Sequence, residues 1–468
     1  MNWRPADRWL MGEAFVGSSI PAHLNALCRE IGSRWGGSGG ERRAARYLRD
    51  QFESYGLHKP VVETFQIDTW ESAASSLEST RRKAGDRKWR ADVRPVLFSA
   101  PVDSTGPIIN AGYGMPHELA GQRGQLRGAI VLLDAGLEPF STPVVLATRL
   151  EGLARAGAVA AVIPNPGGGR RTQHTSGSDW RDRKPSGGAL PAVQTSREDG
   201  AELARLAAEG AEVRLVVRSR RFAATSGNVV AELPGERWPG EHLVVGAHYD
   251  TTPDSPGAND NGSGTSVLVE SARLLAGVRE EARVRPPYGI RPGRTIRFVC
   301  FGSEEQTLQG SYAYVDRHYG DEPKPRLMIN LDELATGNMK GVALVFPELR
   351  FLVQEELDGL RLGLKCHVMA ELDASGDMFP FARAGIPSAM LWRWRFVGRH
   401  PDASFGHSSA DTIDKVRVRE LQEYAGLLAR LLLRLSHVPP RRWPANRLDP
   451  KRISLRLESQ RGTVLRTM

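Results

Sequence analysis

Residues 244–264 read VVGAHYDTTPDSPGANDNGSG, and this stretch decides how the rest of the chain is interpreted. Two valines and a glycine are typical of the end of a buried strand. His248 and Asp250 follow at once, and Asp260 lies further on, within a run of Gly, Asn and Ser. A structural loop does not need these three side chains, whereas histidine nitrogens and carboxylate oxygens are common zinc ligands. The stretch therefore predicts a strand that ends in part of a metal site.

The chain after residue 226 repeats this arrangement of an apolar strand followed by polar groups. Short apolar runs lie at residues 228–235, 242–250, 295–305, 327–333 and 387–392. Helical patterns lie between or after them, for example at 263–277 and 419–435. Apolar strands that alternate with helices predict an α/β fold, in which a mostly parallel mixed sheet is sandwiched by helices. In such sheets ligands bind beyond the carboxyl ends of the strands.

A second, smaller α/β unit interrupts the main one. Residues 20–70 have the pattern of a helix and then a strand, with Ser38 and Glu41 at the spacing of a capping box. Between about 75 and 225 the chain is irregular and then alternates strands with helices, as a complete small domain would. The sequence thus predicts a main domain formed by residues 1–75 and 226–438, an inserted domain at 76–225, and a basic extension at 439–468 without a clear core face.

Length, composition and charge narrow the class of protein. A chain of 468 residues is long enough for two or three domains, and 40% hydrophobic and 25% charged residues are typical of a globular protein. No run of eighteen apolar residues occurs, so no membrane span is expected. The net charge of +9 falls to +3 without residues 441–468, which hold eight Lys or Arg and two acids. Because no stripe of basic and aromatic residues accompanies this charge, no nucleic-acid partner is expected.

Cysteine content and the N-terminal sequence bear on the compartment. The three cysteines, Cys28, Cys300 and Cys366, are odd in number and widely spaced, so they predict neither a disulfide framework nor a zinc motif. Cys300 lies in an apolar strand and is expected to be a small buried hydrophobe. Residues 1–19 lack a basic region followed by a sustained apolar core, so no signal peptide is predicted. A cytoplasmic location is expected, with secretion left open.

Acids and histidines follow four of the predicted strands or their loops. They are His248, Asp250 and Asp260, then Glu304 and Glu305, then Asp332 and Glu333, and last His407 and Asp411. Each group alone has an ordinary explanation in turns or caps. Glu304 and Glu305 are harder to explain, because burying two carboxylates at the end of an apolar strand costs free energy unless cations compensate. The full set exceeds one tetrahedral site and suits two metals about 3.5–4 Å apart that share a bridging carboxylate.

Four motifs, GAHYDT…PGANDNGSG, GSEEQTLQGS, NLDE and GHSSADT, resemble those of the co-catalytic di-zinc exopeptidases of the leucyl aminopeptidase and vacuolar aminopeptidase Y type. The resemblance extends to RWGGSGGERRAARYL and to the insert, which is similar to a protease-associated domain. It covers nearly everything except about the last thirty residues. It implies a fold like that of the zinc aminopeptidases (phosphorylase/hydrolase-like), a peptide substrate, and neither a nucleic-acid nor a membrane partner.

The resemblance also implies a role for each matching residue. His248 and Asp332 bind one zinc, Glu305 and His407 bind the other, and Asp260 bridges the two. Glu304 is the general base and later the general acid, and Asp250 accepts the second ring N–H of His248. Two zinc ions per chain are expected, and cobalt or manganese suits similar ligands. A non-proline cis peptide bond is expected between Asp260 and Asn261.

Several nearby polar residues are open to more than one interpretation. Asp254 is interpreted as a loop residue, in a segment that is either a spacer or part of the substrate rim. Glu333 either lies beside the metal ligands or faces solvent. Asp411 is expected to hold the loop after His407 through backbone hydrogen bonds rather than to bind metal. Asp377 follows Gly376, a departure from the Ser-Asp pattern of the family, which leaves its role open.

The leading hypothesis is a metal-dependent exopeptidase that removes the N-terminal residue of peptides. A carboxypeptidase or dipeptidase of the same fold is the alternative, supported by Arg393, Arg395 and Arg399, which either bind a substrate carboxylate or are solvated loop charges. A glutaminyl-cyclase-like acyltransferase is disfavoured by the insert and the full ligand set. A non-catalytic binding protein is disfavoured because all five ligands and Glu304 are present. The sequence specifies neither the preferred side chain nor the oligomeric state.

Overall fold

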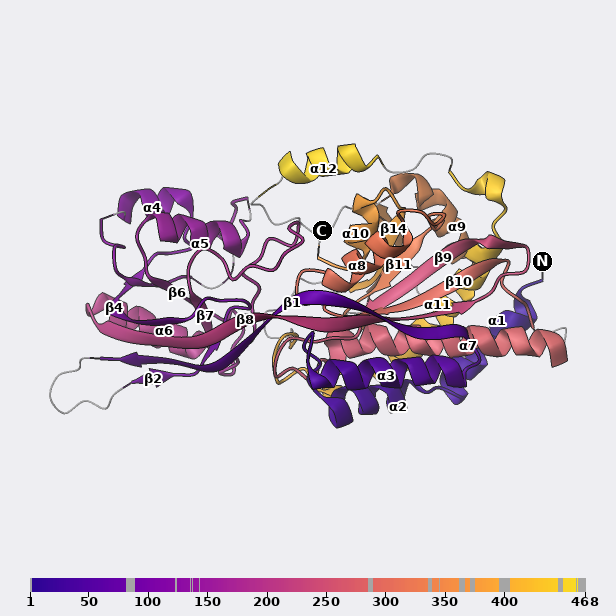
Figure 1. Cartoon of the computed structure of the whole chain (residues 1–468), viewed down its shortest axis with the longest axis horizontal. Coiled ribbons are helices and arrows are strands. Elements are labelled where there is room, and N and C mark those ends of the chain that lie inside the picture. The colour runs from indigo at the N-terminus through magenta and orange to yellow at the C-terminus, as the bar shows by residue number, and fades with distance from the viewer. Residues whose placement is uncertain are drawn as a thin grey trace.

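The chain folds into two lobes that share one pair of long strands (Figure 1). The computed structural model describes residues 2–80, 89–122, 124–134, 136, 138–142, 144–284, 289–335, 339–344, 346–361, 367–370, 375–394, 405–444, 449–459 and 461. Cys366, Arg395 and Arg399 lie outside these residues, and the side chain of Arg393 is not described. Within the described ranges, no helix combines the length and the apolar character needed to cross a membrane.

The larger lobe is built on a mixed sheet with the strand order β13-β12-β14-β11-β9-β10-β8-β1. The strands are β1 (His58–Ser79), β8 (Glu212–Leu233), β9 (Trp238–His248), β10 (Arg294–Phe301), β11 (Met328–Leu331), β12 (Met339–Leu344), β13 (His367–Ala370) and β14 (Ser388–Trp394). Neighbouring strands among β10, β9, β11 and β14 pair in parallel, whereas β12 and β8 pair with them antiparallel. Four carboxyl ends therefore meet at one edge, and the predicted fold class is confirmed.

Helices cover both faces of this sheet. One face carries α1 (Arg4–Val16), α2 (Ile20–Leu24), η1 (Asn25–Ile31), α3 (Gly39–Ser54), α7 (Gly264–Val284) and α11 (Val418–His437). The other carries α8 (Gln309–His318), α10 (Met378–Arg383) and α12 (Pro450–Ser459). The helix α9 (Arg350–Gly359) packs into the same core as α7 and α11. The short elements η2 (Ala258–Ser263), η3 (Pro347–Leu349), η5 (Ile413–Lys415) and η6 (Pro440–Arg442) lie in the connections.

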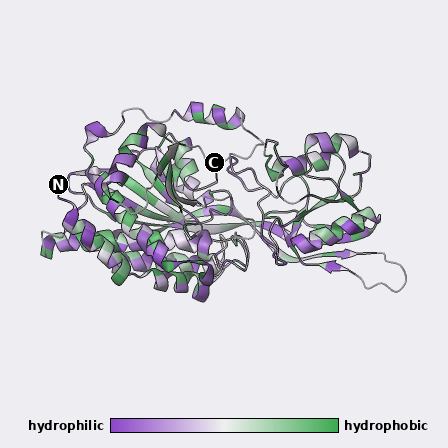
Figure 2. Cartoon of the chain, turned by 180° about the vertical axis from the view of Figure 1, so that it is seen from behind, coloured by the Kyte–Doolittle hydropathy of each residue, from purple (hydrophilic) through white to green (hydrophobic). Residues whose placement is uncertain are grey.

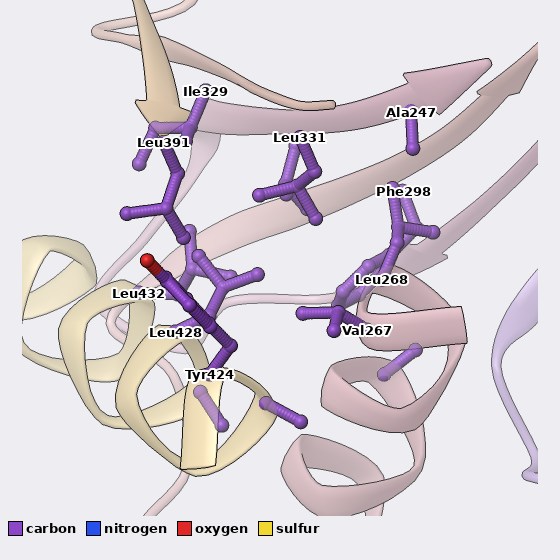
Figure 3. Close-up of a cluster of buried hydrophobic side chains, with 14 of the residues drawn as sticks. Ala247, Val267, Leu268, Phe298, Ile329, Leu331, Leu391, Tyr424, Leu428 and Leu432 are labelled. Atoms are coloured by element: carbon purple, nitrogen blue, oxygen red, sulfur yellow. The ribbon is translucent and has the colours of Figure 1, made fainter. Parts of the chain in front are cut away.

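Side chains alternate between the two faces along each strand. In Figure 3, Leu268 of α7 and Leu428 of α11 pack beneath strand residues such as Leu331. Val245 belongs to this core, whereas its neighbour Val244 belongs to the core on the opposite face, because successive strand side chains point to opposite sides. Figure 2 shows that the strands of the larger lobe are mostly hydrophobic. Burial on both faces explains why they are continuously apolar in sequence.

The smaller lobe extends the sheet through β8-β4-β5-β6-β7-β3. Its strands are β2 (Arg90–Ala91), β3 (Val93–Pro95), β4 (Val102–Asn110), β5 (Ile130–Leu132), β6 (Ala160–Pro164) and β7 (Ala192–Thr195). Its helices are α4 (Pro116–Gln122), α5 (Leu146–Arg155) and α6 (Arg197–Ala208). Two separate hydrophobic clusters lie in this lobe, so it has its own core.

β1 and β8 form an antiparallel ribbon that runs through both lobes. Each strand has 22 residues, and the pairing extends from His58 opposite Glu232 to Ser79 opposite Val213. The boundaries that the sequence suggests, after residues 75 and 225, both fall inside these strands. The two lobes are thus joined by paired backbone rather than by irregular linkers.

The C-terminal extension includes a helix that packs on the larger lobe. Ile453 and Leu457 of α12 are buried in the core beside α10, and Trp443 is also buried. The expectation that residues 439–468 have no core face is therefore wrong for this part. Its two buried apolar residues, four apart on a basic helix, form a stripe too short to stand out in sequence. Arg461 Nη1 then lies 3.0 Å from Asp182 Oδ1 of the smaller lobe.

Candidate metal centre

The carboxyl edge of the parallel strands brings together the side chains that the sequence suggests as ligands. His248 is the last residue of β9, Glu305 follows β10 and Asp332 follows β11. Asp260 lies in η2, just before α7, and His407 lies in the loop before η5. All five therefore reach the site from different segments, as expected for a ligand site at the end of a parallel sheet.

The five side chains form two clusters that share Asp260. In the first, His248 Nε2 lies 3.3 Å from Asp260 Oδ1 and 3.3 Å from Asp332 Oδ1. In the second, His407 Nε2 lies 3.1 Å from Asp260 Oδ2 and 3.1 Å from Glu305 Oε2. Within each cluster the candidate ligand atoms all lie within 4.8 Å of one another. Because Asp260 presents one oxygen to each cluster, it is placed as a bridging carboxylate would be.

The chemistry of these groups fits divalent cations. Five carboxylates at this edge are buried: Asp250, Asp260, Glu304, Glu305 and Asp332. Oε1 of Glu305 has no hydrogen-bond partner among the described residues, and Oε2 faces only the imidazole of His407 within the second cluster. Burial raises the pKa of Glu305 to about 7 and that of Glu304 well above its usual value. Such buried anions are costly alone, and two dications held by nitrogen and oxygen donors would neutralise them.

Protons occupy the site when cations do not. Burial lowers the pKa of His248 and His407, but the carboxylates around them outweigh burial, so that both pKa values are raised well above 6.5. Glu304 and Asp332 act on His248, and Glu305 and Asp260 act on His407. A metal that binds these imidazoles must therefore displace a proton from each.

Asp250 contacts three residues of the site without belonging to either cluster. It is fully buried, and its Oδ1 lies 3.5 Å from Nδ1 of His248. Its two oxygens also accept the backbone N–H groups of Glu304, at 3.0 Å, and Glu305, at 3.2 Å. Asp250 thus faces the ring of one candidate ligand and fixes the main chain of the carboxylate pair.

Comparison with known proteins agrees with this site. The family model for Peptidase family M28 matches residues 228–432, and that for the PA domain matches residues 104–203. Residues 228–432 thus form a domain of peptidase family M28. It is 27% identical over 434 residues to aminopeptidase YwaD of Bacillus subtilis (strain 168), which covers 86% of this chain and 82% of that protein. It is 24% identical over 420 residues to human carboxypeptidase Q, which covers 87% of this chain and 83% of that protein.

Solved structures support the same M28 fold over both lobes. A zinc aminopeptidase from Bacillus subtilis superposes with a TM-score of 0.67 at 25% identity, covering 89% of this chain and 94% of that chain. The peptidase M28 precursor from Shewanella amazonensis SB2B superposes with a TM-score of 0.74 at 19% identity, covering 94% and 98%. The protein is therefore a peptide-bond hydrolase, a metallo-exopeptidase of family M28 that carries a PA domain.

The loop that presents Asp260 in this M28 chain is held by polar contacts. Asp411 accepts the backbone N–H groups of Asn259, at 2.9 Å, and Asp260, at 3.0 Å. Asp411 thus makes the expected kind of backbone hydrogen bond, but it holds the Asp260 loop rather than the loop after His407. Asn261 Nδ2 donates to the carbonyl of Leu331 at 2.8 Å. The bond between Asp260 and Asn261 is cis, as expected.

Glycines in this M28 loop allow close backbone approach. Gly257 has a φ of +59°, and a Cβ there would lie 2.6 Å from the carbonyl oxygen of Asp260. A Cβ on Gly264 would lie 2.5 Å from the carbonyl oxygen of Leu331. The run PGANDNGSG is small and polar because the chain turns directly against the end of β11.

The structure also places the residues whose roles were open. Asp254 has a φ of +60°, and its Oδ2 lies 2.8 Å from Arg94 Nη1 of the smaller lobe. Glu333 is partly buried and accepts a hydrogen bond from Asn259 at 3.1 Å, so it lies beside the ligands. Asp377 is fully buried at the start of α10, and burial raises the pKa of its carboxyl to about 7.

Two supports of the M28 site were missed by sequence reasoning. Arg34 is fully buried and donates to the carbonyls of Tyr249, at 2.6 Å, and Pro256, at 2.8 Å. These bonds hold the loop between His248 and Asp260. Glu41 is buried and accepts from Ser303 at 3.3 Å, and burial together with the charge of Asp250 raises its pKa to about 8. Ser38 caps α3 as predicted, by accepting the N–H of Glu41.

Proposed function

We propose that this peptidase is an aminopeptidase that uses two zinc ions and a glutamate general base. The observation that carries the proposal is the sharing of Asp260 between two clusters, each completed by one histidine and one further carboxylate. His248 and Asp332 would hold one ion, and His407 and Glu305 the other. When bound, the two ions would polarise the scissile carbonyl and lower the pKa of an attacking water.

Glu304 is the group of this chain that would move the proton. It is buried beside the clusters without belonging to either, and its Oε2 lies 3.9 Å from Nε2 of His248. Its carboxylate is therefore left to accept a proton from the attacking water and to deliver that proton to the leaving amine. Burial raises the pKa of Glu304 well above its usual value, which suits a group that must hold a proton between two transfers.

The variant Glu304→Gln tests this role. It keeps the shape of the side chain but cannot accept a proton, so turnover should fall by at least a factor of about 100 while two metals stay bound. Glu53→Gln, at an exposed position of α3, is the matched control and should leave turnover unchanged. Near-normal turnover of Glu304→Gln, with the metal content measured by elemental analysis, would contradict the role.

The terminus at which peptides are cleaved distinguishes an aminopeptidase from a carboxypeptidase. Aminopeptidase YwaD and the zinc aminopeptidase from Bacillus subtilis support removal of N-terminal residues, whereas the similarity to carboxypeptidase Q supports cleavage at the other terminus. Peptides blocked at either end, together with aminoacyl-nitroanilides, distinguish the two. Cleavage of nitroanilides and of C-terminally blocked peptides is expected. Cleavage that persists after N-terminal blocking and requires a free C-terminus would favour the carboxypeptidase.

A further inference from the structure

His407 is in contact with the PA domain through two main-chain groups of His174. The N–H of His174 donates to the carbonyl of His407 at 2.8 Å. In return, Nδ1 of His407 lies 3.0 Å from the carbonyl oxygen of His174. A carbonyl oxygen can only accept, so Nδ1 of His407 must carry the hydrogen. In the neutral ring the lone pair is then on Nε2, which faces Asp260 and Glu305.

The carbonyl of His174 is itself fixed within the PA domain. The His174 side chain is buried, its Nδ1 lies 3.1 Å from the carbonyl oxygen of Pro95, and its ring packs edge-on against Trp70. The next residue, Thr175, accepts the backbone N–H of Leu97 at 2.9 Å. The imidazole of His174 therefore anchors the main chain that contacts His407.

The same PA-domain loop also rests on the larger lobe. Trp180 packs against the core formed with α8, α10 and α12. Arg383 of α10 donates to the carbonyl of Arg181 at 2.8 Å. The loop is thus held at both ends, by the PA sheet near His174 and by the larger lobe near Trp180.

His407 needs such external support more than His248 does. His248 ends a central strand and its side chain is 1% exposed, whereas the side chain of His407 is 30% exposed. His407 also has a φ of +60°, a left-handed conformation that costs free energy in a residue with a side chain. Its local backbone therefore does not by itself favour the orientation in which Nε2 faces the carboxylates.

We propose that His174 is a positioning residue for His407, and that the PA domain thereby completes the metal site formed by Asp260, Glu305 and His407. This inference rests on the proposed two-metal function. Groups that orient a ligand in this way change metal affinity by about 10-fold to 100-fold. The effect should fall on one of the two metals, because the polar contacts described for His248 and Asp332 join them to residues of the larger lobe.

The variant His174→Ala removes the anchor of the supporting main chain. Zinc titration of the metal-stripped full-length protein should show one of two ions bound about 10-fold to 100-fold more weakly and the other unchanged. His174→Gln retains an N–H that can donate to the carbonyl of Pro95, and it should restore part of the lost affinity. His117→Ala is the matched control, because His117 is an exposed histidine of the same lobe that pairs with Glu138.

Two outcomes overturn the proposal. Either both zinc affinities of a folded His174→Ala protein equal those of the wild type, or both fall equally. If His174→Ala does not fold, as judged by thermal unfolding, Arg383→Gln loosens the loop from the other lobe and must weaken the same single ion. A wild-type protein that binds fewer than two zinc ions would instead refute the proposed function, so the two failures are distinguishable.

Discussion

Zinc binding to the metal-free protein should release protons, and the number follows from the side chains at the site. The pKa values of His248 and His407 are raised well above 6.5, since the surrounding carboxylates outweigh burial. Both imidazoles are therefore charged at pH 7 and contribute two protons. Burial raises the pKa of Glu305 to about 7, which adds about half a proton. The total is about 2.5 protons if Glu304 keeps its own, and about 3.5 if it does not.

Calorimetry in buffers of different ionisation enthalpy measures this number directly. At pH 7 the apparent binding enthalpy, plotted against the buffer enthalpy, should give a slope of about 2.5 to 3.5 protons for two zinc ions. Because protons compete with metal, both zinc affinities should rise as pH increases from 6 to 8. His407→Ala removes one charged imidazole but also raises the pKa of Glu305, which this charge lowers, so it should release about half a proton fewer. Release of less than one proton by the wild type would refute the reasoning that the imidazoles are charged before metal binds.

Three further predictions concern stability. Burial lowers the pKa of His23 and His242 to about 4. The stability that these neutral imidazoles contribute is complete above pH 6.5 and is lost as pH falls toward 4. In urea titrations, His242→Gln should therefore reduce the loss of unfolding free energy between pH 7 and pH 5 by about 2 kcal/mol. Arg34→Met leaves buried carbonyls without donors and should lower that free energy by about 3 kcal/mol or more, so a loss below about 1 kcal/mol would contradict its role. Arg94→Ala breaks a solvent-exposed ion pair with Asp254 and should change the free energy of unfolding by less than about 1 kcal/mol.

The clustering of the candidate ligands could be predicted from sequence because each of these residues follows a local pattern. His248, Asp332 and the Glu304–Glu305 pair come directly after apolar strands, and parallel strands bring their carboxyl ends to one edge whatever lies between them in sequence. Arg34 could not be predicted in the same way. It contacts carbonyl groups of residues 249 and 256, and any residue type carries a carbonyl, so no side-chain pattern marks its partners. The role of His174 could not be predicted for the same reason, because His174 contacts His407 through its own main chain.

The sequence does not reveal that the two lobes share continuous strands, because the ribbon that joins them is polar where it passes between the lobes. Residues 218–222 of β8 read RSRRF and are exposed or partly exposed, although they remain paired with β1. A strand segment without a buried apolar face loses the alternation of apolar and polar residues that predicts strands, while its backbone pairing persists. The sequence therefore indicates a boundary where the backbone is continuous.

The two clusters of candidate ligands differ in which segments position them, and under the proposal above this difference makes the PA domain part of the site. Strands β9 and β11 deliver His248 and Asp332 from the middle of the sheet, where packing on both faces fixes the backbone. The other cluster is delivered by loops, and both Ser303, just before the glutamate pair, and His407 have positive φ values. Such conformations persist only where the surroundings impose them. Asp250 does so for Glu305 by accepting its N–H, and His174 does so for His407 from the other lobe. The second cluster is thus completed only when both lobes are in place.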